Sequence, residues 1–392
     1  MSNAFVKLLV SQLFANLADI FFRVTIIANI YMMSKSVMAT SIVPILIGLS
    51  SFVASFLVPL VTKRLALNKV LSLSQFGKTV LLLALVLLFL KIQSVPAIIM
   101  YLFVVAISLL DGFATPVSYA IIPRYASDLG KANAALSMSG EGIQLVGWGL
   151  GGLLFARLGF LTTVLIVLIV YVLSTVLLFL LPNAEVEQLE SETHFDSLLK
   201  GWKLVASNPK LRLFTGANLF EILSNTIWVS SVILVFVTEV LKKSESYWGY
   251  SNTAYSIGVM LGGMMVYKLS ETFLANKWKS ILFSLVGMAM VTVTIVLFPN
   301  AKTFLILSAV IGLLSQLKEV PESVFLQESV GASSLINVYC VLEVLGTLSF
   351  STFLLVMSYL TEHFGLILSF WVSAMSLTLE AIVIYCRRDY LK

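Results

Sequence analysis

One short motif occurs twice in this sequence: FANLADIFFR at residues 14–23 and GANLFEILSN at residues 216–225. The two copies share the pattern Ala-Asn-Leu-x-acid-Ile at a displacement of 202 positions, which aligns Asp19 with Glu221. Each copy places polar and ionisable side chains inside an otherwise apolar run. The repeat therefore predicts a duplicated chain whose two halves carry equivalent polar segments.

The composition around these motifs places the chain in a membrane. Of 392 residues, 59% are hydrophobic and 11% are charged, whereas soluble domains carry about 25% charged residues. The mean hydropathy is +1.00, and apolar runs of about 20 residues, long enough to cross a bilayer as a helix, recur along the chain. The basic residues are scattered over short loops, so we expect no nucleic-acid partner despite the net charge of +5.

Hydropathy and loop punctuation predict twelve transmembrane helices in two groups of six. A hydrophilic connector with a short amphipathic segment, residues 182–210, separates an N-terminal bundle, residues 1–181, from a C-terminal bundle, residues 211–392. The expected fold is an all-α polytopic membrane protein with two pseudo-symmetric six-helix bundles. The predicted spans are 4–33, 37–61, 69–90, 95–121, 132–156, 159–181, 211–240, 247–270, 278–298, 303–326, 333–360 and 364–386.

The distribution of Lys and Arg predicts the orientation of these spans. Sixteen of the 25 Lys and Arg residues fall at the N-terminus, in alternate loops, in the connector and at the C-terminus. Cytoplasmic loops carry an excess of basic residues, so we expect both termini in the cytoplasm.

Four segments resemble the major facilitator superfamily, and more narrowly its macrolide-efflux-like branch of drug antiporters. They are DGFATPVSYAIIPRYASDLGKANAAL at 111–136, GWGLGGLL at 147–154, DSLLKGWKLVASNPKLRLF at 196–214 and VPESVFLQESVGASSLINVY at 320–339. The sequence departs from the family pattern at Thr62, in the place of a loop acid, and at Trp148, in the place of a proline. The resemblance implies a monomeric secondary active transporter in a bacterial plasma membrane, with spans one, four, seven and ten lining a central cavity.

Charged residues inside the spans are costly in a bilayer, so they mark the path that we expect substrate and protons to use. Helical spacing puts Asn16, Asp19 and Arg23 on one face of the first span. We expect Asp19, Glu221 and Glu319 to be the proton-coupling residues. The residues expected to line the substrate cavity are Asn16, Arg23, Asp111, Glu141, Asn218, Asn225, Trp228, Glu322 and Glu343.

Structural roles are the alternative interpretation of the same charges. Asp19 can pair with Arg23, one helical turn away, and Lys318 can pair with Glu322 in the same way. We expect Lys78 to extend its ammonium toward the cytoplasm, and Glu380 to lie near the end of the twelfth span. Glu221 has no basic residue within one turn, which favours a role in carrying a proton.

The favoured function is a proton-coupled exporter of amphipathic or lipophilic small molecules that works by alternating access. The alternative is a dedicated carrier of an endogenous amphiphile such as a lysophospholipid or siderophore, whose anionic head group Arg23 would bind. A membrane receptor or scaffold without transport is a third class. No nucleotide-binding loop is present, because Ser72 stands where the first glycine of GxxxxGKT is required, and we expect no cofactor, no metal site and no enzymatic activity.

Overall fold

The structure is a computed structural model that describes residues 2–34, 37–92, 95–184, 194–228, 230–243 and 246–390. Helices account for nearly all of these residues, and none of them forms a strand. The chain is therefore an all-α polytopic membrane protein, as predicted. Residues 185–193 of the predicted connector 182–210 lie outside the described residues.

The helices of the first half follow the six predicted spans closely. A short helix, α5, intervenes after the fourth span, and the fifth and sixth spans are continuous in α6. The elements are α1 (Asn3–Ser34), α2 (Val37–Thr62), α3 (Leu67–Ile92), α4 (Ala97–Ala120), α5 (Ile122–Tyr125) and α6 (Leu129–Phe179).

The second half begins with α7, the predicted amphipathic segment, and contains the remaining spans. Its elements are α7 (His194–Ser207), α8 (Pro209–Asn225), η1 (Thr226–Trp228), α9 (Ser230–Val235), η2 (Phe236–Val240), α10 (Ser246–Lys268), α11 (Ser270–Ala275), α12 (Lys277–Leu297), α13 (Ala301–Ser329), α14 (Leu335–Phe364), α15 (Leu366–Cys386) and η3 (Arg388–Tyr390). The predicted span 211–240 is thus not one continuous helix, because a 3-10 turn and a π-helical turn interrupt it.

Nine helices of the described chain are long and apolar enough to cross a bilayer by length and composition alone. Three predicted spans are not separate membrane-crossing helices by this criterion, each for a local reason. Span 132–156 runs into the next one within α6, span 211–240 is divided among α8, η1, α9 and η2, and span 247–270 is the less apolar α10.

Glycines with positive φ mark the junctions between the last two spans of each half. Gly159 has φ of 74° inside α6, and Gly365 has φ of 91° just before α15. Residues with a Cβ rarely adopt this conformation, so glycine allows the chain to change direction there within one residue. The junction predicted at 157–158 is consequently a kink at Gly159 within one helical element.

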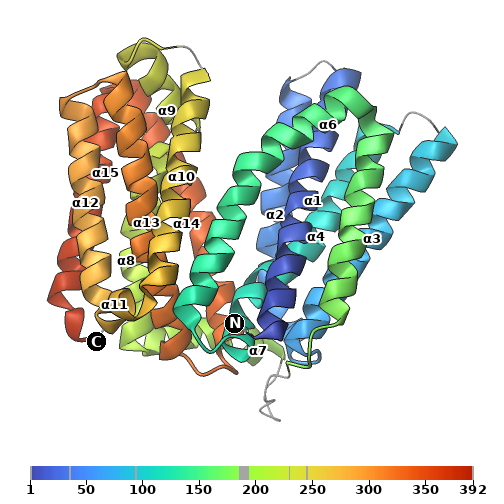
Figure 1. The fold of residues 1–392 in the computed structure, drawn as a ribbon, viewed down its shortest axis with the longest axis horizontal. Helices are drawn as coiled ribbons and strands as arrows, with labels where there is room; N and C mark the ends of the chain where they lie inside the picture. Colours follow the sequence, from blue (N-terminus) through green and yellow to red (C-terminus); the bar gives the residue numbers. More distant parts are fainter. Residues whose placement is uncertain are drawn as a thin grey trace. The chain divides into compact units, whose positions relative to one another are not determined.

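The first compact unit consists of Met1–Ser127, Gly142–Trp202 and Ala332–Val344. Within it, α4 packs against α2 and α3, and α1 packs against α2 (Figure 1). Buried apolar side chains such as Ile26, Leu82 and Phe160 form its core. One member of this core, Tyr171, contacts the first group of intramembrane charges described below.

The second compact unit consists of Asp128–Glu141, Lys203–Gly331 and Leu345–Lys392. In it, α13 packs against α10 and α12, and α15 packs against α12 and α8 (Figure 1). Helices α10 and α13 approach closely, because a Cβ on Gly258 or Gly312 would overlap the backbone of the facing helix. Residues 128–141 belong to this second unit and residues 332–344 to the first. The predicted division at 182–210 assigns these two segments to the opposite halves, and it stays a prediction.

Candidate functional site

The first unit contains a buried lysine held by two aspartates. Lys78 on α3 is 1% exposed, and its Nζ lies 2.8 Å from Asp19 Oδ2 on α1 and 2.8 Å from Asp111 Oδ1 on α4. The hydroxyl of Tyr171 on α6 donates a hydrogen bond to the other oxygen of Asp19. The Lys78 ammonium also lies 5.1 Å from the centre of the Tyr171 ring, a geometry in which ring and cation attract each other.

Arg23 completes this group at its more accessible edge. Its Nη2 lies 3.4 Å from Asp111 Oδ2, and its side chain is 32% exposed. The helical spacing on α1 puts Arg23 one turn from Asp19, as predicted, but the two side chains take different partners. Because Asp19 pairs with Lys78 and Arg23 pairs with Asp111, the expected direct pair between Asp19 and Arg23 is wrong.

Two cations and two carboxylates therefore alternate in the order Arg23, Asp111, Lys78, Asp19. We call these four residues the N-terminal ion cluster. Opposite charges at such distances stabilise each other strongly where water is scarce. The charges of the cluster balance when all four groups are ionised.

The second unit also contains a buried lysine, but three carboxylates surround it. Lys318 on α13 is 1% exposed, and its Nζ lies 2.6 Å from Glu221 Oε2 on α8. The same atom lies 2.9 Å from Glu322 Oε2, one turn further along α13, and 3.2 Å from Glu380 Oε1 on α15. The predicted pairing of Lys318 with Glu322 is confirmed. We call these four residues the C-terminal ion cluster.

Glu319 and Glu141 lie outside the direct contacts of Lys318. Glu319 is exposed on α13 and accepts a hydrogen bond of 2.6 Å from Gln316 Nε2. Glu141 on α6 is half-buried and accepts a hydrogen bond of 3.1 Å from Ser256 Oγ on α10. Both carboxylates therefore already have a protein donor.

The structure brings five of the predicted site residues into the two clusters and leaves the others separate. Asp19, Arg23 and Asp111 meet in the first unit, and Glu221 and Glu322 meet in the second. Among the rest, Asn16 and Asn225 are exposed, and Asn218, Trp228 and Glu343 are half-buried. Their roles in a cavity stay predictions.

Three residues of the clusters, Lys78, Lys318 and Glu380, were not predicted as site residues, and neither was Tyr171, which contacts the first cluster. Lys78 lies eleven residues inside α3, about 16 Å of helix from its beginning. This depth was the signal that its ammonium could not reach the cytoplasmic surface of the membrane, contrary to our expectation. Glu380 lies six residues before the end of α15, in the last third of the span, but it is fully buried beside Lys318. Tyr171 gave no signal, because a tyrosine in an apolar run is ordinary core packing.

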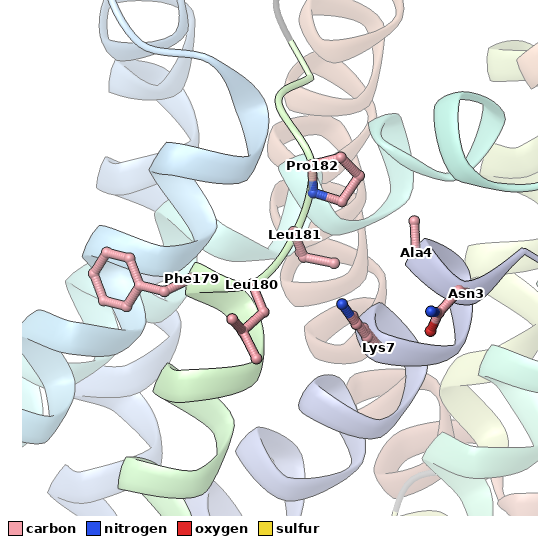
Figure 2. A pocket seen from close by; sticks show the side chains of 7 residues that line it. All are labelled: Asn3, Ala4, Lys7, Phe179, Leu180, Leu181 and Pro182. Carbon is pink, nitrogen blue, oxygen red and sulfur yellow. The ribbon is translucent and has the colours of Figure 1, made fainter.

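A surface depression of about 370 Å³ lies at the ends of α1 and α6, apart from the two ion clusters. Figure 2 shows Lys7 and Asn3 on α1 opposite Leu181 and Pro182, which follow α6. The depression is open, and none of the predicted site residues lines it. Its lining residues are Asn3, Ala4, Lys7, Phe179, Leu180, Leu181 and Pro182.

Comparison with known proteins decides the family. The model of the Major Facilitator Superfamily matches residues 8–315, which is most of the chain. The chain belongs to the Major Facilitator Superfamily. The fold and the general activity expected from the resemblance, membrane transport of small molecules, are thereby confirmed.

Relatives of this superfamily member include two proteins of Bacillus subtilis (strain 168). It is 29% identical over 398 residues to "Uncharacterized MFS-type transporter YfmI", with 100% of this chain and 98% of that protein covered. It is 28% identical over 323 residues to "Uncharacterized MFS-type transporter YjbB", with 82% of this chain and 80% of that protein covered. Both relatives carry the name of transporters.

Solved structures confirm the major facilitator fold at low sequence identity. A bacterial homologue of the iron transporter ferroportin in the outward-facing state matches with a TM-score of 0.79 and 11% identity, covering 99% of this chain and 100% of that one. The human organic anion transporter MFSD10 matches with a TM-score of 0.72 and 14% identity, covering 97% and 98%. At these identities the likeness concerns the fold alone.

Proposed function

We propose that this major facilitator protein is a secondary active exporter that couples the outward movement of amphipathic or lipophilic small molecules to the inward movement of protons. The observation that carries the proposal is the pair of ion clusters within the membrane helices. Each cluster combines a lysine that is buried from water with a carboxylate that is more accessible. This carboxylate is Asp111 in the first unit and Glu221, which is 20% exposed, in the second. Such a carboxylate can exchange a proton with water while its lysine partner stays charged.

Proton exchange gives the clusters a way to drive a conformational cycle. When a proton binds Glu221, its attraction to Lys318 is lost, and the balance of charge among Glu322, Glu380 and Lys318 changes. A change of this kind alters the relative free energies of two conformations only if the contacts differ between them. The proposed exporter uses this difference to bias alternating access.

The proposal also concerns location and family branch. The basic loops favour cytoplasmic termini, and the Bacillus relatives favour a bacterial plasma membrane. The segments at 111–136, 147–154, 196–214 and 320–339 favour the macrolide-efflux-like branch, and the same resemblance favours function as a monomer. Glu319 and Asp19 are additional candidates for the coupled proton, and Glu319 is the more accessible of the two.

The test is flux in proteoliposomes that contain the purified protein, measured with and without a pH gradient. A lipophilic cationic dye is the first substrate to use, because isolated carboxylates in an apolar environment favour such molecules. We expect Glu221→Gln to abolish stimulation by the gradient, whereas Glu239→Gln, an exposed glutamate in the same half, leaves it intact. Full stimulation of Glu221→Gln would remove Glu221 from the coupling.

A second candidate function is supported by Arg23. Its side chain is 32% exposed, and its guanidinium lies 3.4 Å from its only ion-pair partner in the described chain, Asp111, which leaves room for an anionic head group. The candidate is a carrier of an anionic amphiphile such as a lysophospholipid. Loss of lysophospholipid transport in Arg23→Ala, with dye export unchanged, would favour this function over the first.

A further inference from the structure

The two ion clusters differ in their balance of charge. In the N-terminal ion cluster, Lys78 and Arg23 face Asp19 and Asp111. In the C-terminal ion cluster, Lys318 alone faces Glu221, Glu322 and Glu380. With every group ionised, the first cluster is neutral and the second carries two excess negative charges.

An uncompensated charge away from water is expensive, and a carboxylate avoids the cost by binding a proton. The three glutamates of the second cluster are not equal in this respect. Glu221 is partly exposed to solvent and makes the shortest contact with Lys318, and Glu322 accepts a hydrogen bond from the same ammonium at 2.9 Å. Each of them therefore accepts a hydrogen bond that favours its charged form.

Glu380 has the least support for a negative charge. Its side chain is 0% exposed, and neither of its carboxyl oxygens has a hydrogen-bond partner within the described chain. Among the described residues, its one polar contact is the ion-pair distance of 3.2 Å to Lys318, which lacks the geometry of a hydrogen bond. Of the three glutamates, Glu380 is the one for which protonation costs least.

Helices α8 and α12 pack against α15, and α13 reaches Glu380 through the side chain of Lys318. Helix α8 contributes Glu221, and α13 contributes Lys318, Glu319 and Glu322. The buried stretch of α12, Ile281 to Ile295, contains no ionisable residue. Beyond these helices, Tyr255 on α10 and Glu141 on α6 lie within electrostatic reach of Glu319. Lys318 is thus the only cation among these neighbours.

We propose that Glu380 holds a proton at neutral pH and that this proton, released as Glu380 becomes a carboxylate, is the one exchanged during transport, with the more accessible Glu221 of the same cluster passing it to and from water. This inference narrows the candidates for the coupled proton, because the charges of the N-terminal ion cluster already balance and it binds no such proton. The inference rests on the proposed function for the role of the proton in transport, but the protonation of Glu380 can be tested without transport. It assigns the coupling to the second unit and to the twelfth span.

The first experiment is infrared difference spectroscopy on the purified full-length protein in lipid at neutral pH, comparing wild type with Glu380→Gln. A protonated carboxyl group absorbs separately from a carboxylate. We expect the variant to lose one carboxylic-acid band that Asp19→Asn and Glu271→Gln, an exposed glutamate on α11, both retain. Persistence of the full band in Glu380→Gln, or its absence from wild type, would overturn the proposal.

Glutamine has nearly the shape of a protonated glutamate, so we expect Glu380→Gln to fold. If it does not fold, Glu380→Asp is the second variant. The expected result is then a shift in the frequency of the carboxylic-acid band, and an unshifted band would count against the proposal. If sodium raises the Tm of wild type and the carboxylic-acid band is absent, a sodium ion neutralises the C-terminal ion cluster. That result would also overturn the proposal.

The second experiment separates this inference from the proposed function. In proteoliposomes, we expect Glu380→Gln to exchange dye down the dye gradient. We expect the stimulation of its dye flux by a pH gradient to be at least tenfold smaller than that of wild type. Stimulation equal to wild type would overturn the role of Glu380 and leave the exporter function intact. Absence of dye flux from wild type would remove the exporter function, while the infrared result would still decide whether Glu380 holds a proton.

Discussion

Asp19 and Glu221, which occupy equivalent places in the repeated motif, each hold a buried lysine. Asp19 Oδ2 lies 2.8 Å from Lys78 Nζ, and Glu221 Oε2 lies 2.6 Å from Lys318 Nζ. The lysines themselves are not equivalent, because Lys78 is on the third span of its half and Lys318 is on the fourth. The two halves thus reach the same local chemistry, an acid on the first helix and a buried ammonium, through different helices.

Replacement of Lys318 by Met leaves three glutamates without their shared cation. Removing one partner of a buried ion pair costs about 3–5 kcal/mol, so we expect a large loss of stability, measured as a lower Tm of the purified protein in detergent. Lys302→Met, at an exposed position near the start of α13, is the matched control and should change Tm little. An unchanged Tm in Lys318→Met would mean that the C-terminal ion cluster does not contribute to stability.

Replacement of Tyr171 by Phe removes the hydroxyl that donates to Asp19 and keeps the ring beneath the Lys78 ammonium. A hydrogen bond to a charged group contributes about 1.5–3 kcal/mol. We expect Tyr171→Phe to lower the free energy of unfolding by an amount in that range, measured by thermal or denaturant unfolding. Tyr250→Phe, at an exposed tyrosine on α10, should be neutral, and equal effects of the two substitutions would contradict the assigned hydrogen bond.

Replacement of Gly159 by Ala forces a Cβ into a backbone with φ of 74°. The combination of φ 74° and ψ −179° is essentially restricted to glycine and costs another residue about 1–3 kcal/mol, so we expect a lower Tm although no neighbouring atom lies in the way of the new methyl group. Gly249→Ala, which has equal space in the ordinary helical backbone of α10, should raise Tm slightly. Equal responses would show that the kink in α6 does not depend on Gly159.

Asp128 caps the beginning of α6 from a position outside the membrane-spanning segments. Its Oδ1 accepts a hydrogen bond of 2.9 Å from the backbone N–H of Lys131, and its Oδ2 lies 3.0 Å from the Lys131 ammonium. Partial desolvation raises the pKa of Asp128, but the two interactions with Lys131 outweigh it and hold the pKa below its usual value of 3.8. We expect Asp128→Ala to cost about 1 kcal/mol at neutral pH.

The sign of the pH dependence follows from this lowered pKa. The Asp128 carboxylate contributes stability above the pKa of the unfolded chain and loses that contribution as pH falls through the lower pKa of the folded protein. The Tm difference between wild type and Asp128→Ala should therefore shrink as pH falls from about 6 to about 3. A difference that is constant with pH would indicate that the ionised carboxylate is not the capping form.

The helices of this protein could be predicted from the sequence because the signal for each one is local. A run of some 20 apolar residues must satisfy its backbone hydrogen bonds within itself once it lies in a bilayer, so hydropathy alone placed α1, α3 and α12 almost residue by residue. The repeat of the first span in the seventh predicted which helices carry equivalent charges. The spacing of Lys318 and Glu322, one turn apart on α13, predicted their contact for the same local reason.

The tertiary structure alone decided which charges share a cluster. Lys78 and Asp19 are separated by 59 residues and Lys318 and Glu221 by 97, and their contacts depend on how α1, α3, α8 and α13 pack. Helix periodicity gives the face on which a charge lies but not the helix that this face meets. For that reason Asp19 and Arg23, which the spacing on α1 predicted as partners, are paired with residues of α3 and α4 instead, and Glu380 acquired its place beside Lys318 only when α15 packed against its neighbours.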